Sequence, residues 1–203
     1  MSPSAASAPV GEPLDERFFE RSVHDVAPAL VGCSLRVGGV GGVIVETESY
    51  DRYDPACHAY AGRTPRSEVL FGPPAHAYVY FSYGIHSLLN FVCEPEGSAA
   101  AVLLRALEPV WGTAEMARRR GVADPRLFCS GPGRLSEALG IGLDQNRAPL
   151  LEPPFELHAR GSEWRGVEVV AGPRIGISVA TERPWRFCAV GSPHLSRPVR
   201  AAA

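Results

Sequence analysis

Two glutamates lie two positions apart in the segment VIVETESYDRY, which runs from Val43 to Tyr53. In a β-strand alternate side chains share a face, so the segment would place Ile44, Glu46, Glu48 and Tyr50 on one side. Two carboxylates on one face are typical of general acid–base chemistry. Alternating acids are also common on solvent-facing strands, and the pattern alone favours that structural interpretation. The pair is therefore a candidate site that needs support from elsewhere in the chain.

Side chains with imidazole, guanidinium and phenol groups follow this segment closely. His58 is followed by a loop that contains Arg63 and Arg66, and then by the string AYVYFSYG, which is unusually rich in tyrosine. Asn90 stands in the apolar string SLLNF, where a buried amide needs hydrogen-bond partners. Taken singly, these residues would be core tyrosines, an ordinary loop histidine and an amide bonded to backbone. Their concentration after the two glutamates strengthens the candidate site.

The elements that must position these side chains are mostly short strands. The spacing of apolar residues from Asp15 to Leu30 is roughly helical, with Ser22 as a cap and Pro28 breaking the pattern into short pieces. The remaining predicted strands are Ser34–Val37, Gly42–Tyr50, Ala77–Tyr83, Ser87–Cys93, Ala99–Leu107, Phe155–His158, Val167–Val170 and Arg174–Val179, and the further helices are Thr113–Arg120 and Gly133–Leu139.

These elements predict a mixed α/β (α+β) fold. We expect a single domain over residues 14–200, built on a curved, largely antiparallel β-sheet or open barrel that is surrounded by helices. Residues 1–13 are rich in Ala, Ser and Pro, and we expect them to form a disordered leader.

The composition is that of one globular domain. The chain has 203 residues, of which 45% are hydrophobic and 21% charged. The formal net charge of -2 argues against a nucleic-acid partner, although runs such as the three arginines at 118–120 allow a local basic face. The sequence shows neither an apolar run of the roughly 20 residues that span a bilayer nor a secretory signal, so we expect a cytoplasmic protein without a membrane partner.

Cysteine, histidine and lysine usage limits the chemistry further. The 5 cysteines show no CxxC spacing and the 6 histidines show no ligand spacing, so we expect neither disulfides nor a metal site. All 20 basic residues other than histidine are arginines. Without lysine a lysine Schiff base cannot form, so any base-removing activity would use water as nucleophile unless the terminal amine serves.

Several strings in the chain resemble the characteristic blocks of the alkyladenine (3-methyladenine) DNA glycosylases. They are VETESY, HAYAGRTPRS, AYVYFSYGIH, LLN, VLLRALEP, FCSGPGRL, PRIGI, PWRF and GSPH, they occur in the family's order, and they span about Leu14 to Ser196. The resemblance implies that residues 14–200 form a catalytic domain of this kind. It also implies a monofunctional enzyme that flips a damaged purine out of duplex DNA and hydrolyses its N-glycosidic bond.

The resemblance implies that Glu48 is the general base. N-glycosidic hydrolysis passes through a cationic, oxocarbenium-like sugar, and an ionised carboxylate beside it can activate water and stabilise that charge. Two helpers for the water are implied as well, the Arg105 side chain and the main-chain carbonyl of Ile175. Burying an arginine unpaired in an apolar strand is costly, so we expect Glu48 to be the partner of Arg105. A structural salt bridge is the alternative.

The same resemblance assigns a pocket for the flipped base. Tyr50 and Tyr80 would stack on the purine, with His58 on the opposite side, and a cationic alkylated purine would gain a cation–π contribution. Asn90 would exclude normal guanine by crowding its exocyclic amine. A hydrogen bond from Asn90 to backbone explains a buried amide equally well.

Other residues are matched to contacts with DNA. Tyr83 corresponds to the family's wedge, which fills the gap left by the extruded nucleotide. The candidate contacts to the DNA backbone are Arg63, Arg66, Ser130 and Gly131, the last two at the entry to a helix.

The implied partner is double-stranded DNA containing damaged purines, with no cofactor and no metal. We expect a monomer in the cytoplasm, associated with the nucleoid. Two alternatives stay open at this point: a noncatalytic nucleic-acid-binding module with the same sheet and tyrosines, and a hydrolase of free nucleosides with the same carboxylate.

Overall fold

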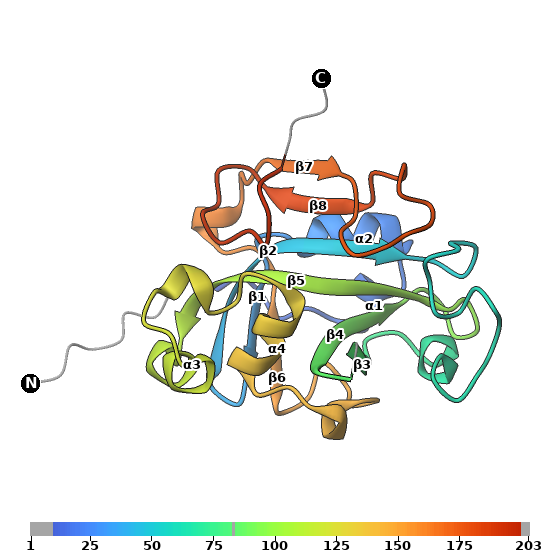
Figure 1. Ribbon diagram of the computed structural model, residues 1–203, viewed down its shortest axis with the longest axis horizontal. Helices are drawn as coiled ribbons and strands as arrows, with labels where there is room; N and C mark the ends of the chain where they lie inside the picture. Colours follow the sequence, from blue (N-terminus) through green and yellow to red (C-terminus); the bar gives the residue numbers. More distant parts are fainter. Residues whose placement is uncertain (1–9, 83, 200–203) are drawn as a thin grey trace, which may run out of the picture.

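The chain folds around one curled antiparallel sheet (Figure 1), as a computed structural model shows for residues 10–82 and 84–199. Six strands follow the order β3-β4-β5-β2-β1-β6, and β8 pairs with both β2 and β7. Every strand pair among the described residues is antiparallel. The strands are β1 Ser34–Val37, β2 Val40–Tyr50, β3 Ala77–Ser82, β4 His86–Cys93, β5 Ala100–Trp111, β6 Phe155–His158, β7 Val169–Gly172 and β8 Arg186–Ala189. The predicted α+β domain on a curved antiparallel sheet is confirmed.

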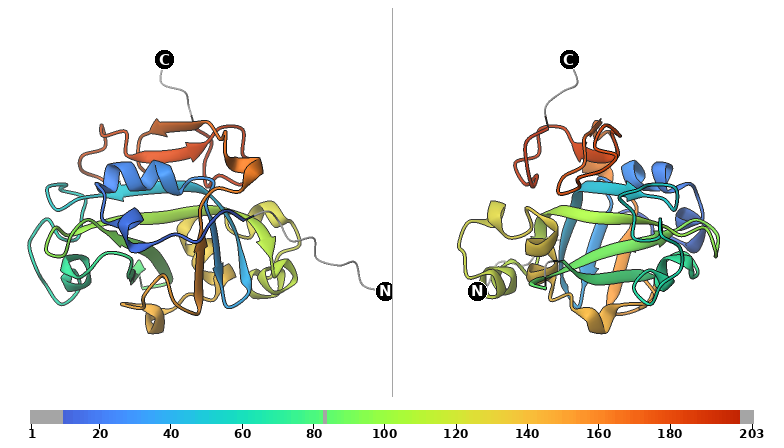
Figure 2. Two further views of the ribbon diagram at one scale, coloured as in Figure 1. Left: turned by 180° about the vertical axis from the view of Figure 1, so that it is seen from behind. Right: turned by 45° about the vertical axis from the view of Figure 1, so that its right-hand side comes forward.

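Short helices surround the sheet (Figure 2). Helix α2 packs on β2 and β5, α4 packs on β4 and β5, and α3 packs on α4. The α-helices are α1 Glu16–Phe19, α2 Val23–Leu30, α3 Thr113–Arg120 and α4 Pro132–Leu139. Single turns of 3-10 helix occupy Glu68–Phe71, Pro125–Leu127, Leu143–Gln145 and Ser162–Trp164. The two central strands β2 and β5 are thereby covered, and they carry the candidate carboxylates and arginine.

An irregularity in the pairing of β2 with β5 sets the direction of these side chains. The register shifts between Ile44 and Glu46 and again between Glu46 and Thr47. Ile44 belongs to the principal core together with residues of α2, and the hydroxyl of Thr47 donates to Ala27 in α2. Glu46 instead contacts Arg105 of β5. The prediction that Ile44 shares a face with the glutamates is therefore wrong, because a bulge interrupts the alternation.

Three clusters of buried apolar side chains support the sheet, the third of them around Val45, Ala106 and Ala189. The largest cluster joins α1 and α2 to the core face of β1, β4 and β5 and to α4. A smaller cluster includes Cys57, Leu70, Phe71 and Val92, and Tyr50 and Tyr80 pack against it. The two tyrosines predicted to bind a base thus rest on a rigid apolar layer.

The helical segment at residues 15–30 is broken at a different place from the one predicted. Pro28 lies inside α2, and the break falls between Phe19 and Val23. Ser22 makes no side-chain capping bond; the carboxylate of Glu94 accepts the hydrogen bond from the Val23 N–H instead. A long-range acid thus replaces the local cap, which sequence spacing alone does not show.

Two further boundaries differ from the prediction. Residues 174–179 form a loop rather than a strand, and the last strand is β8 at Arg186–Ala189. Within the predicted leader, the Gly11 N–H donates to Ala159, and the Ala159 N–H donates to Glu12. Gly11 and Glu12 therefore belong to the folded domain; residues 1–9 lie outside the described residues.

The remaining expectations concern the cysteines, membrane-spanning helices and the candidate wedge. All five cysteines are buried and free. In residues 10–82 and 84–199, no helix is both long enough and apolar enough to cross a membrane. The candidate wedge Tyr83 lies outside the described residues.

Candidate active site

Glu48 is completely buried in β2 and has three hydrogen-bonding or ionic partners. Its Oε1 accepts the Ile175 N–H at 2.8 Å, and its Oε2 accepts the Tyr50 hydroxyl at 2.8 Å. Arg105 Nη1 lies 3.2 Å from the same Oε2. Burial raises the pKa of Glu48 above its usual value, while Arg105, the Ile175 N–H and the Tyr50 hydroxyl oppose that rise. Glu48 is thus poised to exchange a proton closer to neutral pH than an exposed glutamate.

The second carboxylate, Glu46, is held in a different way. Burial raises its pKa, but Arg105, Ser196 and Arg186 outweigh burial, so the pKa of Glu46 lies below its usual value. Arg105 Nε and Arg186 Nε each donate to Glu46 Oε1 at 2.8 Å, and Ser196 donates both its N–H and its hydroxyl at 2.6 Å. Two carboxylates in contact with one arginine therefore have opposite pKa shifts. Glu46 is the group that favours the anion, and Glu48 is the group that more readily takes up a proton.

The predicted Glu48–Arg105 ion pair is present, but Glu46 is the closer partner of Arg105. Ile175 is also beside Glu48, and the atom in contact is its N–H. The role predicted for the Ile175 carbonyl stays a prediction. The contact of Arg186 with Glu46 was not anticipated, since the two residues lie 140 positions apart, and the string PWRF that contains Arg186 does not indicate its partner.

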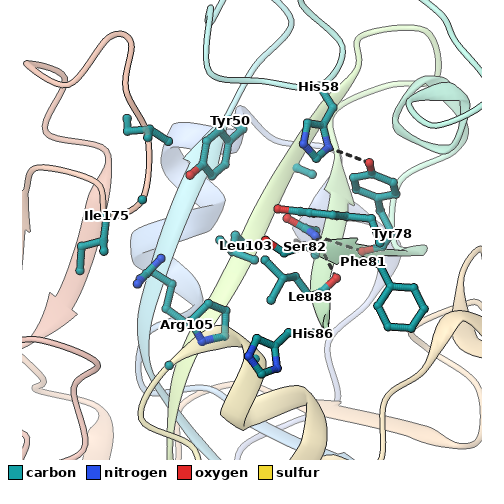
Figure 3. A pocket seen from close by; sticks show the side chains of 18 of the residues that line it. Tyr50, His58, Tyr78, Phe81, Ser82, His86, Leu88, Leu103, Arg105 and Ile175 are labelled. Carbon is teal, nitrogen blue, oxygen red and sulfur yellow. Dashed lines mark hydrogen bonds between the residues drawn. The ribbon is translucent and has the colours of Figure 1, made fainter. Parts of the chain in front are cut away.

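A cavity of about 940 Å³ opens beside this group (Figure 3). The three residues that contact the Glu48 carboxylate, Tyr50, Arg105 and Ile175, all line it. Glu48 does not itself line the cavity and lies directly behind these three. Figure 3 shows them on one side of the cavity, with His58 and Tyr78 across from them. The volume is at the upper end for a small-molecule site.

The opposite wall is a cluster of aromatic rings. His58 Nδ1 lies 2.8 Å from the Tyr78 hydroxyl oxygen, and the His58 ring meets the Tyr80 ring edge to face at 4.5 Å. Tyr78 and Tyr80 are stacked with centroids 5.3 Å apart. Burial and then the Arg66 charge lower the pKa of His58 to about 4, so the imidazole is neutral at physiological pH. Tyr78 was not singled out by sequence reasoning, although the density of tyrosines was the signal for it.

Asn90 is a buried residue of the cavity lining. Its amide nitrogen donates to the Tyr78 carbonyl at 3.1 Å and to the Leu88 carbonyl at 3.4 Å. These are the backbone hydrogen bonds that the sequence left open as an explanation. Asn90 also lines the cavity, so the bonds fix the orientation of an amide that faces any bound molecule.

The predicted DNA contacts separate into two groups. Arg66, Ser130 and Gly131 line the cavity, and the Arg66 guanidinium lies 5.1 Å from the centre of the Tyr80 ring. Arg63 is not part of the lining and lies over Phe71 at 5.0 Å. Ser130 and Gly131 directly precede helix α4. The structure therefore brings three of the four residues to the cavity.

An aromatic cavity with a titratable carboxylate behind one wall is suited to holding a planar ring beside a group that can accept a proton. Residues 17–193 match the family described as "Methylpurine-DNA glycosylase (MPG)". The chain belongs to the methylpurine-DNA glycosylase family.

Relatives cover almost the whole chain. A protein of Rhodopseudomonas palustris is 56% identical over 197 residues, which are 97% of this chain and 94% of the relative. A protein of Bradyrhizobium diazoefficiens is 54% identical over 98% of both chains. A protein of Nitrosospira multiformis is 56% identical over 90% of this chain and 93% of its own. Each of the three bears the name "Putative 3-methyladenine DNA glycosylase".

Proposed function

We propose that the protein is a 3-methyladenine-type DNA glycosylase of base excision repair that hydrolyses the N-glycosidic bond of damaged purines in double-stranded DNA. The family and the names of the relatives support the glycosylase activity. The observation that carries the assignment is Glu48, buried behind Tyr50, Arg105 and Ile175 at the wall of the aromatic cavity. The enzyme acts as a monomer in the cytoplasm, at the nucleoid, where its substrate is.

Glu48 activates the water that attacks the sugar. A carboxylate has about four acceptor positions, and the Ile175 N–H and the Tyr50 hydroxyl take two of them, while Arg105 forms an ion pair with Oε2. Acceptor capacity therefore remains for a water molecule. The ionised carboxylate also stabilises the positive charge that develops on the sugar as the base departs.

The enzyme leaves an abasic site and does not cleave the DNA strand. Strand cleavage by a bifunctional glycosylase proceeds through a Schiff base with an amine. The chain has no lysine, and no other side chain provides such an amine. Apart from the terminal amine, water is the nucleophile that this chemistry leaves, and the proposed activity is therefore monofunctional.

The damaged base is flipped out of the duplex and held between Tyr50 on one wall and Tyr80 with His58 on the other. Asn90, fixed by its two backbone bonds, crowds the exocyclic amine of normal guanine. Tyr83 is the wedge that fills the vacated stack. Its neighbours Phe81 and Ile85 are 49% and 71% exposed, as an apolar surface that enters the minor groove would be.

Purified protein tests the activity on duplexes that each carry one lesion, such as hypoxanthine or 3-methyladenine, treated with alkali to reveal abasic sites. We expect base release from duplex, no strand break before alkali, and no loss of activity in EDTA. Turnover of free nucleosides without duplex would favour the nucleoside hydrolase. Binding without release of any lesion would favour the noncatalytic module.

The rate of base release should depend on the ionisation of Glu48. Because burial raises the pKa of Glu48, the rate falls on acidification with a midpoint above the ordinary glutamate value of about 4.3. His58, whose pKa is lowered to about 4, stays neutral through this range and adds no second transition near its usual value. Single-turnover rates on a hypoxanthine duplex measure the profile, and a midpoint at or below the ordinary glutamate value would contradict it.

A further inference from the structure

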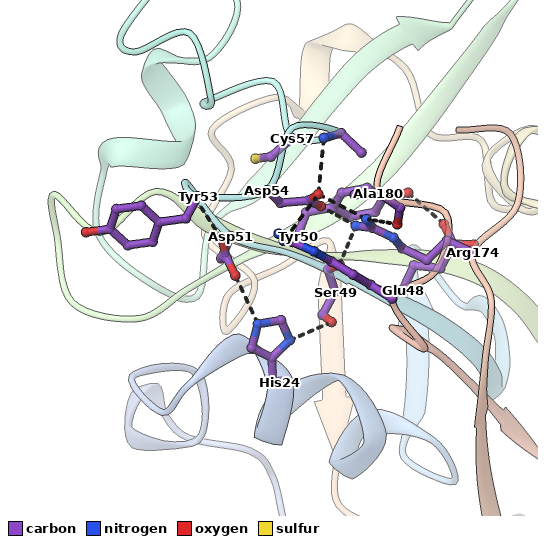
Figure 4. A network of polar contacts seen from close by, with 12 residues as sticks. His24, Glu48, Ser49, Tyr50, Asp51, Tyr53, Asp54, Cys57, Arg174 and Ala180 are labelled. Carbon is purple, nitrogen blue, oxygen red and sulfur yellow. Dashed lines mark hydrogen bonds and ion pairs between the residues drawn. The ribbon is translucent and has the colours of Figure 1, made fainter. Parts of the chain in front are cut away.

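A second buried ion pair lies outside the group around Glu48. The Arg174 and Asp54 side chains are both fully buried and form two hydrogen bonds, one of them from Arg174 Nη2 to Asp54 Oδ1 at 3.0 Å (Figure 4). Arg174 also donates to the Ser49 carbonyl at 3.1 Å. Desolvating two charges usually cancels most of their attraction, so such a pair contributes little to stability compared with apolar packing. Its position in the fold indicates a different purpose.

Arg174 lies between two aromatic rings. Its guanidinium carbon is 4.6 Å from the centre of the Tyr50 ring and 5.1 Å from the centre of the Trp185 ring. Tyr50 is the cavity wall whose hydroxyl donates to Glu48. The cation therefore packs against the ring that carries this hydroxyl, and it restricts the tilt of that ring.

The same arginine fixes a second partner of Glu48. Arg174 directly precedes Ile175, whose N–H donates to Glu48. A shift of the Arg174 backbone would move this N–H away from the carboxylate. On the other side of the pair, the Asp54 carboxylate accepts the Ala56 N–H, and the Asp54 main-chain carbonyl accepts the Cys57 N–H, in the turn that leads to His58. One ion pair thus joins the end of β2, the turn before His58 and the loop after Gly172.

We propose that the Asp54–Arg174 pair is a positioning unit for base release, which holds the Tyr50 hydroxyl and the Ile175 N–H against Glu48 and sets the distance across the base pocket. The inference rests on the proposed function. Asp54 and Arg174 do not touch the base; they act through Tyr50, Ile175 and His58. A misplacement of about 1 Å in such a site costs on the order of 100-fold in rate.

The pair also affects the ionisation of Glu48. The Tyr50 hydroxyl and the Ile175 N–H both lower the pKa of Glu48, so loosening them raises that pKa further. The titratable and charged groups that face Glu48 are Glu46 and Tyr50 of β2, Arg105 of β5, Tyr80 of β3, Cys188 of β8 and Arg174. Of these groups, only Arg174 contacts Asp54; the other arginine beside Asp54 is Arg183, whose Nη1 lies 3.7 Å from Asp54 Oδ1. If the Asp54–Arg174 pair served stability alone, its replacement would not shift the pH dependence of base release.

Two variants separate geometry from charge. Arg174→Lys keeps the cation but loses the planar fork, and Asp54→Asn keeps the shape but loses the anion. For each variant we expect single-turnover release of hypoxanthine to slow by about 10- to 100-fold. The fall in rate on acidification should begin at a higher pH than in the wild-type protein; this part of the pH profile is its acid limb. Affinity for a duplex with a stable abasic-site analogue should be retained.

Matched controls are Arg160→Lys and Glu156→Gln. Arg160 donates to the carbonyls of Val31 and Pro28, and Glu156 pairs with Arg36 between β1 and β6. Neither residue lines the cavity, so both controls should keep the wild-type rate and profile.

The outcomes are decisive in each direction. Wild-type rates and an unmoved acid limb in both test variants would overturn the positioning role. So would the failure of both variants to fold, judged by circular dichroism and thermal unfolding, because the pair would then serve stability alone. If only one variant folds, its rate and profile decide. Absence of base release by the wild-type protein would instead defeat the proposed function, which keeps the two failures distinct.

Discussion

Replacement of Glu48 by glutamine should lower base release by about 100- to 10,000-fold, the range that a positioned general base contributes. Glutamine has nearly the shape of glutamate and can still accept the Ile175 N–H, but it cannot take a proton from water. It also lacks the negative charge that stabilises the oxocarbenium-like sugar. Single-turnover excision of hypoxanthine from duplex measures the loss.

Binding should respond differently from chemistry in this variant. The aromatic walls and the cavity rim are unchanged by Glu48→Gln, so affinity for a lesion-containing duplex should be retained. Glu68→Gln is a suitable control, because Glu68 forms an exposed ion pair with Arg147 and does not line the cavity. Full activity of Glu48→Gln would remove this carboxylate from the mechanism.

Local sequence patterns were sufficient for most of the fold. The strands Ser34–Val37 and Phe155–His158 and the helix Thr113–Arg120 have the bounds that were predicted. Alternation or helical spacing between glycine and proline signals defines such elements within a few residues of chain. The loop at 174–179 was mistaken for a strand because its apolar residues alternate, although no partner strand pairs with it among the described residues.

The candidate site was predicted where a motif places several side chains together. Glu48, Tyr50 and Arg105 lie in the strands β2 and β5, and the resemblance to a family located them. The same motifs did not reveal that Glu46 shares Arg105, because that depends on the bulge between the strands. Whether an alternating glutamate faces solvent or core is decided by that local geometry.

The supporting ion pairs could not be predicted from the sequence. Arg174 meets Asp54 across 120 residues, and Arg186 meets Glu46 across 140 residues. A single arginine in a loop has the same local pattern whether it is solvated or buried against an acid. Its role emerges only when tertiary packing excludes water and leaves the acid as its partner.

Arg105 should be the residue whose loss destabilises the fold most strongly within the site. Arg105→Met fills a similar volume but leaves Glu46 and Glu48 buried without their shared cation. Removing one partner from a buried ion pair costs about 3–5 kcal/mol. For a domain of this size the expected fall in Tm is roughly 10 °C, measured by thermal unfolding at neutral pH. Base release should be lost as well, since Arg105 is in contact with Glu48.

The pH dependence of this loss identifies its cause. Arg105 lowers the pKa of both Glu46 and Glu48, so without it both folded-state pKa values rise. A carboxyl group whose folded-state pKa exceeds its unfolded value destabilises the fold above that folded-state pKa, and the penalty disappears as the pH falls toward the unfolded value. In the wild-type protein, by contrast, Glu46 has a lowered pKa, and its stabilisation is lost on acidification.

Only the raised pKa values of the variant act between about pH 7.5 and about 5, because the stabilisation by Glu46 in the wild-type protein is lost only below the unfolded glutamate value of about 4.3. The gap in Tm between wild type and Arg105→Met should therefore narrow as the pH is lowered from about 7.5 to about 5. Arg36→Met is the comparison, because its pair with Glu156 is partly exposed and contributes only about 0–1 kcal/mol. A gap for Arg105→Met that stays constant over this range would show that lost packing, rather than the loss of the cation beside Glu46 and Glu48, causes the instability.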